Sequence, residues 1–385
     1  MKKITKLTGI LAALTLIFAL GACANGAEDT NNPEPKNENK GKEILEETFA
    51  STKVENIESI DGVYYFDFAG DYGLEDLIEK QFTNDTALSS YLASNIANWV
   101  GNTNNQINLS ITVPGAGCTS ITAENAGSTG GKIFGRNFDY KKGNAVVIHT
   151  KPATGLGYES VSTSYTQFFT GDRNWLPTGE QLHDLSLLAA IYVPMDGMNE
   201  KGFYVSILEA GDKEITAQNK SGNKNIQTTV AVRYLLDKAD SVDTALNLLK
   251  DFNMYSVYET AYHFALADNT GKSVVVEYIN NEMKVQDAKV VTNHYLVENS
   301  GKTAPKETDD TLLRYNTAKS AGDAAGWKMT PEQMRNTLKA AAAKQYDDKG
   351  EHISIWSAVY EPSAKKVTYY FREDYTKYAE VTFGN

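Results

Sequence analysis

Short stretches of β-type sequence follow one another through most of the chain after Gly117, and this feature most constrains the fold. They cover residues 132–138, 145–149, 203–208, 262–267, 273–278 and 288–292. A late hairpin is predicted between residues 353–360 and 366–371, across the turn Glu361-Pro362-Ser363-Ala364. Because strands and helices come in blocks rather than in strict alternation, the pattern favours an α+β fold over a doubly wound parallel sheet.

Helical patterns lie between and before these strands. Apolar periodicity predicts helices over residues 74–82, 88–100, 228–238 and 242–252. A further helix is predicted from Pro331 to about Tyr346, because Thr330 can cap it and Gln333 completes a capping box. We therefore expect a helical segment at residues 43–117, before the strand-rich region at 118–385.

Composition sets limits on the class of protein. Of the 385 residues 41% are hydrophobic and 22% are charged, which is ordinary for a globular protein with a sizeable core. The formal net charge is -12, which argues against nucleic acid or another polyanion as a partner. A soluble catalytic domain with an acidic surface is the expectation.

The N-terminus has the features of an export signal. Lys2, Lys3 and Lys6 precede an apolar run at residues 7–20 that is too short for a comfortable membrane span. The run ends in Leu20-Gly21-Ala22-Cys23, which resembles the bacterial lipobox. We expect residues 1–22 to be a signal peptide and Cys23 to be lipidated, although a plain signal peptide or a short anchor remains the alternative.

Residues 23–42 are rich in Asn, Glu, Pro, Lys and Gly and have almost no apolar side chains, so they predict a disordered tether. The protein is then an exported lipoprotein, anchored by lipid to the outer side of the cell membrane. Oligomeric state has no signal in the sequence.

Cys118 is the second of only two cysteines. If Cys23 carries lipid, Cys118 has no partner for an intramolecular disulfide. An unpaired thiol in an exported protein is a candidate nucleophile, and the alternative is a buried, inert cysteine.

The sequence around Cys118 resembles the choloylglycine hydrolase family, which includes bile salt hydrolases, penicillin V acylases, acid ceramidase and N-acylethanolamine acid amidase. Several motifs in chain order carry the resemblance: Gly117-Cys118-Thr119-Ser120-Ile121, Phe134-Gly135-Arg136-Asn137-Phe138-Asp139-Tyr140, Asp196-Gly197-Met198-Asn199-Glu200-Lys201-Gly202, Val291-Thr292-Asn293 and Arg314-Tyr315. The resemblance implies an N-terminal-nucleophile hydrolase, in which two mainly antiparallel sheets lie between helical layers.

The resemblance also implies roles for individual residues. Cleavage before Cys118 releases its α-amino group, which Asp139 holds and which serves as the general base for the thiol. Asn293 donates to the oxyanion of the tetrahedral intermediate, a contribution of about 3 kcal/mol, and Arg314 completes the electrostatic field. Glu209 stands where bile salt hydrolases carry asparagine, and members similar to N-acylethanolamine amidase, which cleave themselves, use a glutamate in a similar place.

Arg136 is a candidate on chemical grounds. A free cysteine has a pKa of about 8.5, so activation at neutral pH needs nearby positive charge. In a regular strand Arg136 and Asp139 point to opposite faces, so both reach one site only if the strand ends or bulges there.

The expected reaction is hydrolysis of small-molecule N-acyl amides with an apolar acyl group, without a cofactor or a metal. Phe168, Phe169 and Trp175 are candidates for the acyl pocket, with ordinary core packing as the alternative. The sequence does not distinguish bile acid, fatty acyl or phenoxyacetyl groups, or hydrolysis from acyl transfer.

Two other readings stay open. A Cys-His hydrolase would use one of His149, His183, His263, His294 and His352, of which His294 follows Asn293 directly. A ligand-binding lipoprotein without catalysis would share the signal, the tether and the acidic surface. No HExxH motif or clustered Cys/His spacing supports metal catalysis.

Overall fold

The computed structural model describes residues 53–56, 62–99, 109, 116–178, 181–211, 215–256, 260–298, 301, 303–343 and 352–384. The predicted signal peptide, the tether and Cys23 lie outside the described residues. Within the described ranges, no helix combines the length and the apolar character needed to cross a membrane.

The larger of two stacked sheets has nine strands in the order β1-β2-β5-β6-β7-β8-β11-β12-β13. Their bounds are β1 Lys53–Asn56, β2 Val63–Gly70, β5 Ala145–Pro152, β6 Ser160–Tyr165, β7 Asp196–Asn199, β8 Tyr204–Glu209, β11 Tyr262–Ala267, β12 Ser273–Ile279 and β13 Glu282–Asp287. Neighbouring strands are antiparallel except β2 and β5, which pair in parallel. This one parallel pair joins the segment before Cys118 to the sheet that follows it.

The second sheet has seven strands and carries Cys118. Its path is β14-β3-β4-β16-β17-β18, and β15 pairs with β3 off this path. The bounds are β3 Gly117–Asn125, β4 Lys132–Lys141, β14 Val290–Val291, β15 Lys328–Met329, β16 His352–Glu361, β17 Lys366–Phe371 and β18 Ala379–Thr382. A single 3₁₀ turn, η2 (Pro362–Ala364), connects β16 to β17.

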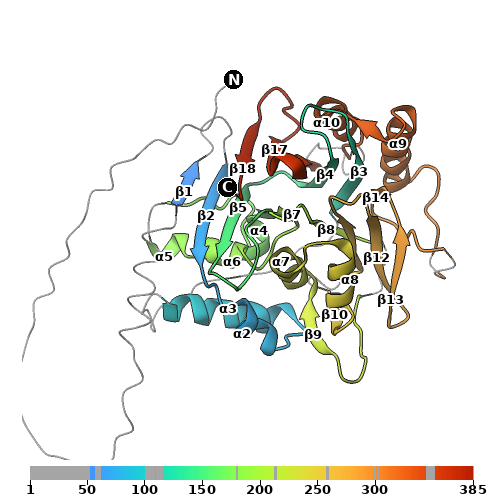
Figure 1. Cartoon of the computed structure of the whole chain (residues 1–385). Helices are drawn as coiled ribbons and strands as arrows, with labels where there is room; N and C mark the ends of the chain where they lie inside the picture. Colours follow the sequence, from blue (N-terminus) through green and yellow to red (C-terminus); the bar gives the residue numbers. More distant parts are fainter. Residues whose placement is uncertain are drawn as a thin grey trace, which may run out of the picture.

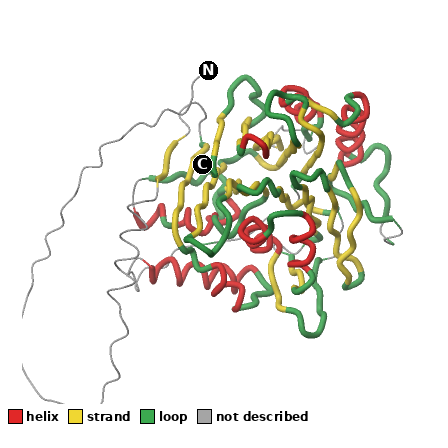
Figure 2. The backbone as a smooth tube through the Cα atoms, viewed as in Figure 1, coloured by secondary structure: helices red, strands yellow, loops and turns green. Residues whose placement is uncertain are grey.

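Helices cover the outer faces of both sheets (Figures 1 and 2). Helix α7 (Thr228–Lys238) packs on β7 and β8, with α8 (Val242–Leu249) beside it. On the other sheet, α9 (Asp310–Ala324) packs on β3 and β14, and α10 (Pro331–Ala340) packs on β4 and β16. The layers are therefore helix, sheet, sheet and helix, which confirms the predicted α+β sandwich.

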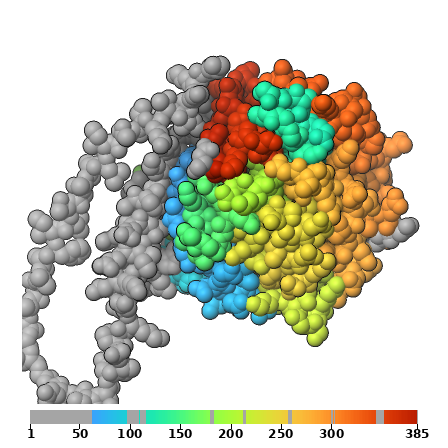
Figure 3. Space-filling view, viewed as in Figure 1, coloured from blue at the N-terminus to red at the C-terminus, as the bar shows by residue number. Residues whose placement is uncertain are grey.

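The remaining described elements pack around these layers. They are α2 (Leu74–Glu79), α3 (Asp85–Trp99), α4 (Gln167–Thr170), α5 (Gln181–Asp184), α6 (Ser186–Ala190) and a parallel pair of short strands, β9 (Lys224–Gln227) and β10 (Phe252–Tyr255). In the space-filling view the blue surface before Cys118 lies directly against the green surface that includes β5 (Figure 3).

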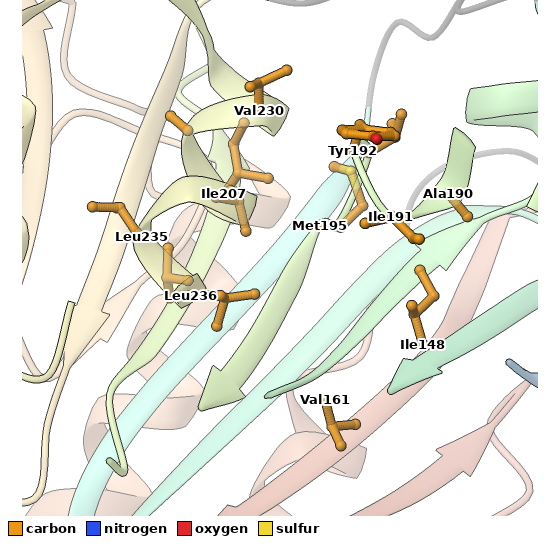
Figure 4. Close-up of a cluster of buried hydrophobic side chains, with 14 of the residues drawn as sticks. Ile148, Val161, Ala190, Ile191, Tyr192, Met195, Ile207, Val230, Leu235 and Leu236 are labelled. Atoms are coloured by element: carbon orange, nitrogen blue, oxygen red, sulfur yellow. The ribbon is translucent and has the colours of Figure 1, made fainter. Parts of the chain in front are cut away.

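Burial of apolar side chains fixes the distance between α7 and the nine-stranded sheet. Figure 4 shows Val230, Leu235 and Leu236 of α7 gathered with Ile207 of β8, and each of these side chains is at most 2% exposed. At roughly 1.5–3 kcal/mol for each fully buried aliphatic side chain, this contact is a large stabilising term. It holds β8, from which Tyr204, Ile207 and Glu209 contribute to the site described below.

Most predicted elements are present, with differences at their ends. The capping box at Thr330 and Gln333 is confirmed, but α10 ends at Ala340 rather than near Tyr346. The predicted strand over 288–292 is limited to β14, and the helix predicted over 242–252 ends at Leu249. The segment 43–117 holds the two predicted helices but also β1 and β2, so its description as helical was incomplete.

Candidate active site

Cys118 is the second residue of β3 and lies between the two sheets. Its side chain is buried, and its cross-strand partner on β4 is Phe138. Ser120, two residues on and therefore on the same face, hydrogen-bonds to the hydroxyl of Tyr204 on β8 at 3.1 Å. The thiol thus faces the nine-stranded sheet.

Nearby charged side chains shift the pKa of this thiol in opposite directions. Burial raises the pKa of Cys118, Arg136 and Arg314 oppose that rise, and Asp139 adds to it, so that the pKa lies above its ordinary value. With the chain intact between Gly117 and Cys118, the thiol is therefore protonated and shielded from solvent.

Arg136 points from β4 to the opposite sheet. Its Nη2 donates to the carbonyl oxygen of Ile207 at 2.9 Å, and its Nε lies 3.2 Å from Oδ2 of Asp196. The Nη1 atom has no hydrogen-bond partner among the described residues. A fully buried guanidinium with a remaining donor is placed to interact with a thiolate or an oxyanion.

Asp196 holds Arg136 in place and was not predicted as a site residue. Its carboxylate also accepts hydrogen bonds from Nε1 of Trp356 at 2.9 Å and from the hydroxyl of Tyr360 at 2.6 Å. Asp196 is the first residue of the Asp-Gly-Met-Asn motif, so the sequence did mark this position. It did not show that Asp196 pairs with Arg136, which lies 60 positions earlier in the chain.

Asp139 lies on the other face of β4. It accepts a hydrogen bond from the Ser354 hydroxyl, while its Oδ2 has no hydrogen-bond partner among the described residues. Burial raises the pKa of Asp139, although Arg314, Ser354 and Arg136 counteract the rise. A buried carboxyl with an open oxygen favours a cation, such as an amine, beside it.

Arg136 and Asp139 lie on opposite faces of β4, and both act electrostatically on Cys118. Asp139 is the cross-strand partner of Gly117, the residue just before Cys118. The predicted end or bulge of β4 is not found: β4 pairs with β3 in unbroken register through both residues, and the β-bulge between Ser354 and Trp356 lies in the neighbouring strand β16. Arg136 lies on the face of the sheet that the Cys118 side chain also occupies, whereas Asp139 lies across from Gly117, the residue that precedes Cys118.

Asn293 follows β14 and spans the backbone around the Gly117-Cys118 bond. Its Oδ1 accepts a hydrogen bond from the backbone N–H of Cys118 at 2.6 Å. Its Nδ2 donates to the carbonyl oxygens of Ala116 at 3.1 Å and Glu209 at 2.8 Å. One amide side chain thus holds the residues on both sides of Gly117.

Glu209, at the end of β8, contacts the same stretch. Its Oε2 accepts from the backbone N–H of Ala116 at 3.0 Å, and its Oε1 accepts from the Thr260 hydroxyl at 3.2 Å. The structure therefore brings Glu209 together with the other candidate residues, beside the backbone that precedes Cys118.

Arg314 reaches the site from the first turns of α9. It donates to the carbonyl oxygen of Cys118, to Oγ1 of Thr119 at 3.3 Å and to Oδ1 of Asn293 at 2.8 Å. Asp310, four residues earlier, accepts from its Nε at 2.6 Å. The guanidinium thus fixes the backbone of Cys118 and the orientation of the Asn293 amide together.

The aromatic candidates are buried in the adjoining core. Phe168 packs edge-to-face on Phe138, with ring centroids 5.7 Å apart, and Phe138 is the cross-strand partner of Cys118. Phe169 and Trp175 pack on each other at 5.9 Å, further from the thiol. Phe168 is therefore the closest of the three to the site by contact, and their role in substrate binding stays a prediction.

The histidine next to Asn293 is the base that the Cys-His alternative would use. Nδ1 of His294 hydrogen-bonds to the hydroxyls of Thr292 and Thr311, and its ring packs on Tyr315. Burial, with the charge of His263, lowers the pKa of His294 to about 4. A neutral imidazole with these partners does not favour the Cys-His alternative.

Comparison with known proteins identifies the family of this chain. The family model for acyl-coenzyme A:6-aminopenicillanic acid acyl-transferase matches residues 127–375, well over half of the chain. A penicillin V acylase from Pectobacterium atrosepticum is 25% identical over 114 residues, a stretch that is 27% of this chain and 30% of that protein. The matched stretch is thus less than a third of that relative's length.

Solved structures show the fold. Two crystal structures of single-residue variants of the conjugated bile acid hydrolase from Clostridium perfringens align with TM-scores of 0.50 and 0.51, each at 14% identity. Each alignment covers 69% of this chain and 92% of the hydrolase. This chain therefore belongs to the acyl-coenzyme A:6-aminopenicillanic acid acyl-transferase family and has the N-terminal-nucleophile hydrolase fold of the conjugated bile acid hydrolase.

Proposed function

We propose that this protein is a cysteine amidohydrolase that cleaves linear N-acyl amides through a thioester on Cys118, after the chain has been cut between Gly117 and Cys118. The observation that carries the proposal is the clamp on this bond. Asn293 and Glu209 bind Ala116, and Asn293 and Arg314 bind Cys118. Asp139, whose Oδ2 has no hydrogen-bond partner among the described residues, is the cross-strand partner of Gly117.

The cut is proposed as self-cleavage: the Cys118 thiol attacks the carbonyl carbon of Gly117, the acyl group moves from nitrogen to sulfur, and water hydrolyses that thioester to leave the Gly117 carboxylate and a free α-amine on Cys118. This amine is the base that the intact chain lacks. The new α-amino group of Cys118 replaces the backbone N–H that Asn293 accepts from, next to Asp139. The neutral amine takes the thiol proton, and the sulfur attacks the carbonyl carbon of the substrate. The protonated amine then gives its proton to the leaving nitrogen, which departs as the free amine and leaves the acyl group on sulfur.

Water completes the cycle. The α-amine accepts a proton from a water molecule as that water attacks the thioester, and the carboxylic acid and the thiol are restored. Arg136 and Arg314 favour the thiolate by charge, in agreement with their lowering effects on the pKa of Cys118.

Asn293 changes partners in this scheme. In the intact chain its Nδ2 donates to Ala116 and Glu209. When Ala116 leaves, one Nδ2–H can turn to the oxyanion of the tetrahedral intermediate, where such a donor contributes about 3–4 kcal/mol. The uncleaved chain therefore does not turn over external amides for two reasons: it has no α-amine to act as the base, and this donor is occupied.

The proposed substrates are small N-acyl amides with an apolar acyl group. Supporting this, Phe138 lies across from Cys118 and joins a cluster with Phe168, Tyr140 and Tyr165, whose ring centroids are 5.1–6.2 Å apart. An acyl chain bound beside the thiol would meet these rings. The lipid on Cys23 would hold the enzyme at the outer side of the membrane and take no part in the reaction.

Acyl transfer is the second candidate, because the matching family model describes an acyl-transferase. The acyl-enzyme is the same in both reactions, and the acceptor differs. An amine acceptor added to the assay separates them: transfer yields a new amide, whereas hydrolysis yields only the free acid.

The experiment is a panel of N-acyl amides that vary in acyl group, assayed with purified cleaved protein. Wild type is expected to release the amine, and trapped enzyme is expected to carry the acyl mass on Cys118. Cys118→Ala is the inactive control. A wild-type Cys118 that neither turns over any amide nor reacts with a small electrophile at neutral pH would favour the ligand-binding lipoprotein instead.

A further inference from the structure

A buried histidine-glutamate pair lies beside the segment that carries Asn293. His263 on β11 and Glu277 on β12 are direct cross-strand partners, so their side chains leave the same face of the nine-stranded sheet. Both side chains are 0% exposed, and Nδ1 of His263 lies 3.2 Å from Oε1 of Glu277. Charged groups buried to this degree are costly unless their partners are well placed.

The imidazole binds the residue just before Asn293. Nε2 of His263 lies 2.9 Å from the carbonyl oxygen of Thr292. A carbonyl oxygen only accepts and a carboxylate only accepts, so both ring nitrogens of His263 act as donors. The side chain therefore bridges Glu277 and the backbone of Thr292, and neither nitrogen is left to take a proton from the thiol.

The carboxylate binds the backbone that follows Asn293. Oε1 of Glu277 accepts from the N–H of Leu296 at 2.7 Å, and Oε2 accepts from the N–H of Val297 at 3.0 Å. Burial would raise the pKa of Glu277, but His263 and these two N–H groups outweigh it and hold the pKa below its ordinary value. The glutamate is thus ionised and fully paired.

We propose that the His263-Glu277 pair is the positioning element for Asn293, and hence for the oxyanion donor. Three backbone atoms around Asn293 are fixed by this one pair, on residues 292, 296 and 297. The pair belongs to the nine-stranded sheet, whereas Asn293 follows β14 of the seven-stranded sheet. It therefore ties the two sheets together at the site. The inference rests on the proposed role of Asn293 and deepens it.

Contacts that do not involve the His263-Glu277 pair also restrict the backbone at Asn293. Gly211 has φ +74°, and a Cβ there would overlap the carbonyl oxygen of Asn293. On the other side the Thr292 hydroxyl donates to the carbonyl oxygen of Thr311 at 3.1 Å. The His263-Glu277 pair adds charged hydrogen bonds to these contacts. Because the other contacts remain, weakening the pair should move the amide of Asn293 by a fraction of an ångström rather than unfold the segment.

The test compares Glu277→Gln with Tyr278→Phe, its neighbour on β12. Tyr278 is buried and its hydroxyl has no hydrogen-bond partner among the described residues, so the phenylalanine variant controls for a buried change on the same strand. Glu277→Gln is expected to lower kcat on the best acyl amide by about 10-fold to 100-fold, with KM within about twofold, since small misplacements of a catalytic group cost this much. Tyr278→Phe is expected to keep wild-type kcat.

A double variant separates positioning from general destabilisation. In an Asn293→Ala background, Glu277→Gln is expected to lower kcat by less than about twofold further, because residues that act through one group are not additive. Additive losses, or an unchanged kcat in Glu277→Gln alone, would overturn the inference. If Glu277→Gln does not fold, His263→Gln, which can keep a donor for Thr292, gives the same comparison.

Failure of the proposed function has a different signature, namely a wild type that cleaves no acyl amide. Amide hydrogen exchange at Leu296 and Val297 then decides the inference alone. Faster exchange in Glu277→Gln than in Tyr278→Phe supports the positioning contact, and equal exchange contradicts it.

Discussion

The side-chain amide of Asn293 accepts the backbone N–H of Cys118 at 2.6 Å and at the same time donates to Ala116, on the other side of Gly117. The group proposed to bind the oxyanion is thus in contact with the proposed nucleophile before the chain is cut. Maturation would exchange one partner of this amide and leave its position unchanged.

Replacement of Asn293 by alanine is expected to lower kcat of the cleaved enzyme by about 100-fold to 1,000-fold, the usual cost of one lost oxyanion donor. His294→Ala is expected to cost far less, because that imidazole bonds to Thr292 and Thr311 rather than to the thiol. Steady-state kinetics of both variants measures the difference. A silent Asn293 change together with an inactive His294 variant would support the Cys-His mechanism instead.

Gly211→Ala is expected to lower kcat more than Gly222→Ala does. Both glycines have positive φ, +74° and +89°, so both substitutions carry a backbone cost of about 1–2 kcal/mol. Only at Gly211 does the added Cβ meet the backbone of Asn293, whereas nothing lies within 4 Å at Gly222. Equal kcat values for the two variants would show that the contact with Asn293 is unimportant for catalysis.

His149 is expected to make stability depend on pH. Burial alone would lower its pKa, but hydrogen bonds to Asp67 at 3.0 Å and Glu159 at 2.8 Å raise it above the ordinary 6.5. A raised folded-state pKa stabilises the fold below pH 6.5, and this contribution is lost as pH rises through the folded-state pKa. Glu159, whose pKa is lowered, stabilises above its ordinary 4.5 and loses that effect as pH falls through its folded-state pKa.

The contribution of the His149-Glu159 pair to the free energy of unfolding is therefore largest between the ordinary pKa values of the two groups, 4.5 and 6.5. Thermal unfolding of wild type and His149→Gln should differ more near about pH 6 than near about pH 9. A difference in Tm that is constant with pH would contradict this assignment. Since Asp67 lies on β2, ahead of Cys118, the measurement also reports on how firmly that segment is held.

Cys23→Ala is expected to release the protein from the membrane fraction. The reason is the sequence Leu20-Gly21-Ala22-Cys23, which resembles a lipobox and makes the Cys23 thiol the proposed site of lipid attachment. Cell fractionation followed by detection of the protein measures the outcome. Unchanged membrane association of the variant would argue against lipidation.

Local patterns in the sequence predicted the elements well where those elements are set by local chemistry. Helix α7 over 228–238 and strand β11 over 262–267 have the predicted bounds, and the Thr330 cap forms as expected. By contrast, the β-rich run of β2 was read as part of a helical segment, because its partner β5 lies beyond residue 140 and no local window contains both.

The candidate site likewise has residues that local motifs predicted and contacts that they did not. The motifs identified Cys118 and the polar residues that gather around it, but they carried no information on Ser354, which pairs with Asp139 from 215 positions away. Nor could periodicity reveal the β-bulge in β16, which lies where that strand pairs with β4 beside Asp139. Such contacts depend on how the sheets register, which is decided by packing over the whole domain.

Intact mass spectrometry of the purified protein tests the central claim most directly. Wild type should consist of two chains that separate between Gly117 and Cys118, with a free cysteine amine at the start of the second, while Cys118→Ala should remain a single chain. A fully active wild type that is still uncut at this bond would contradict the account, because the amine proposed as the base could not then exist.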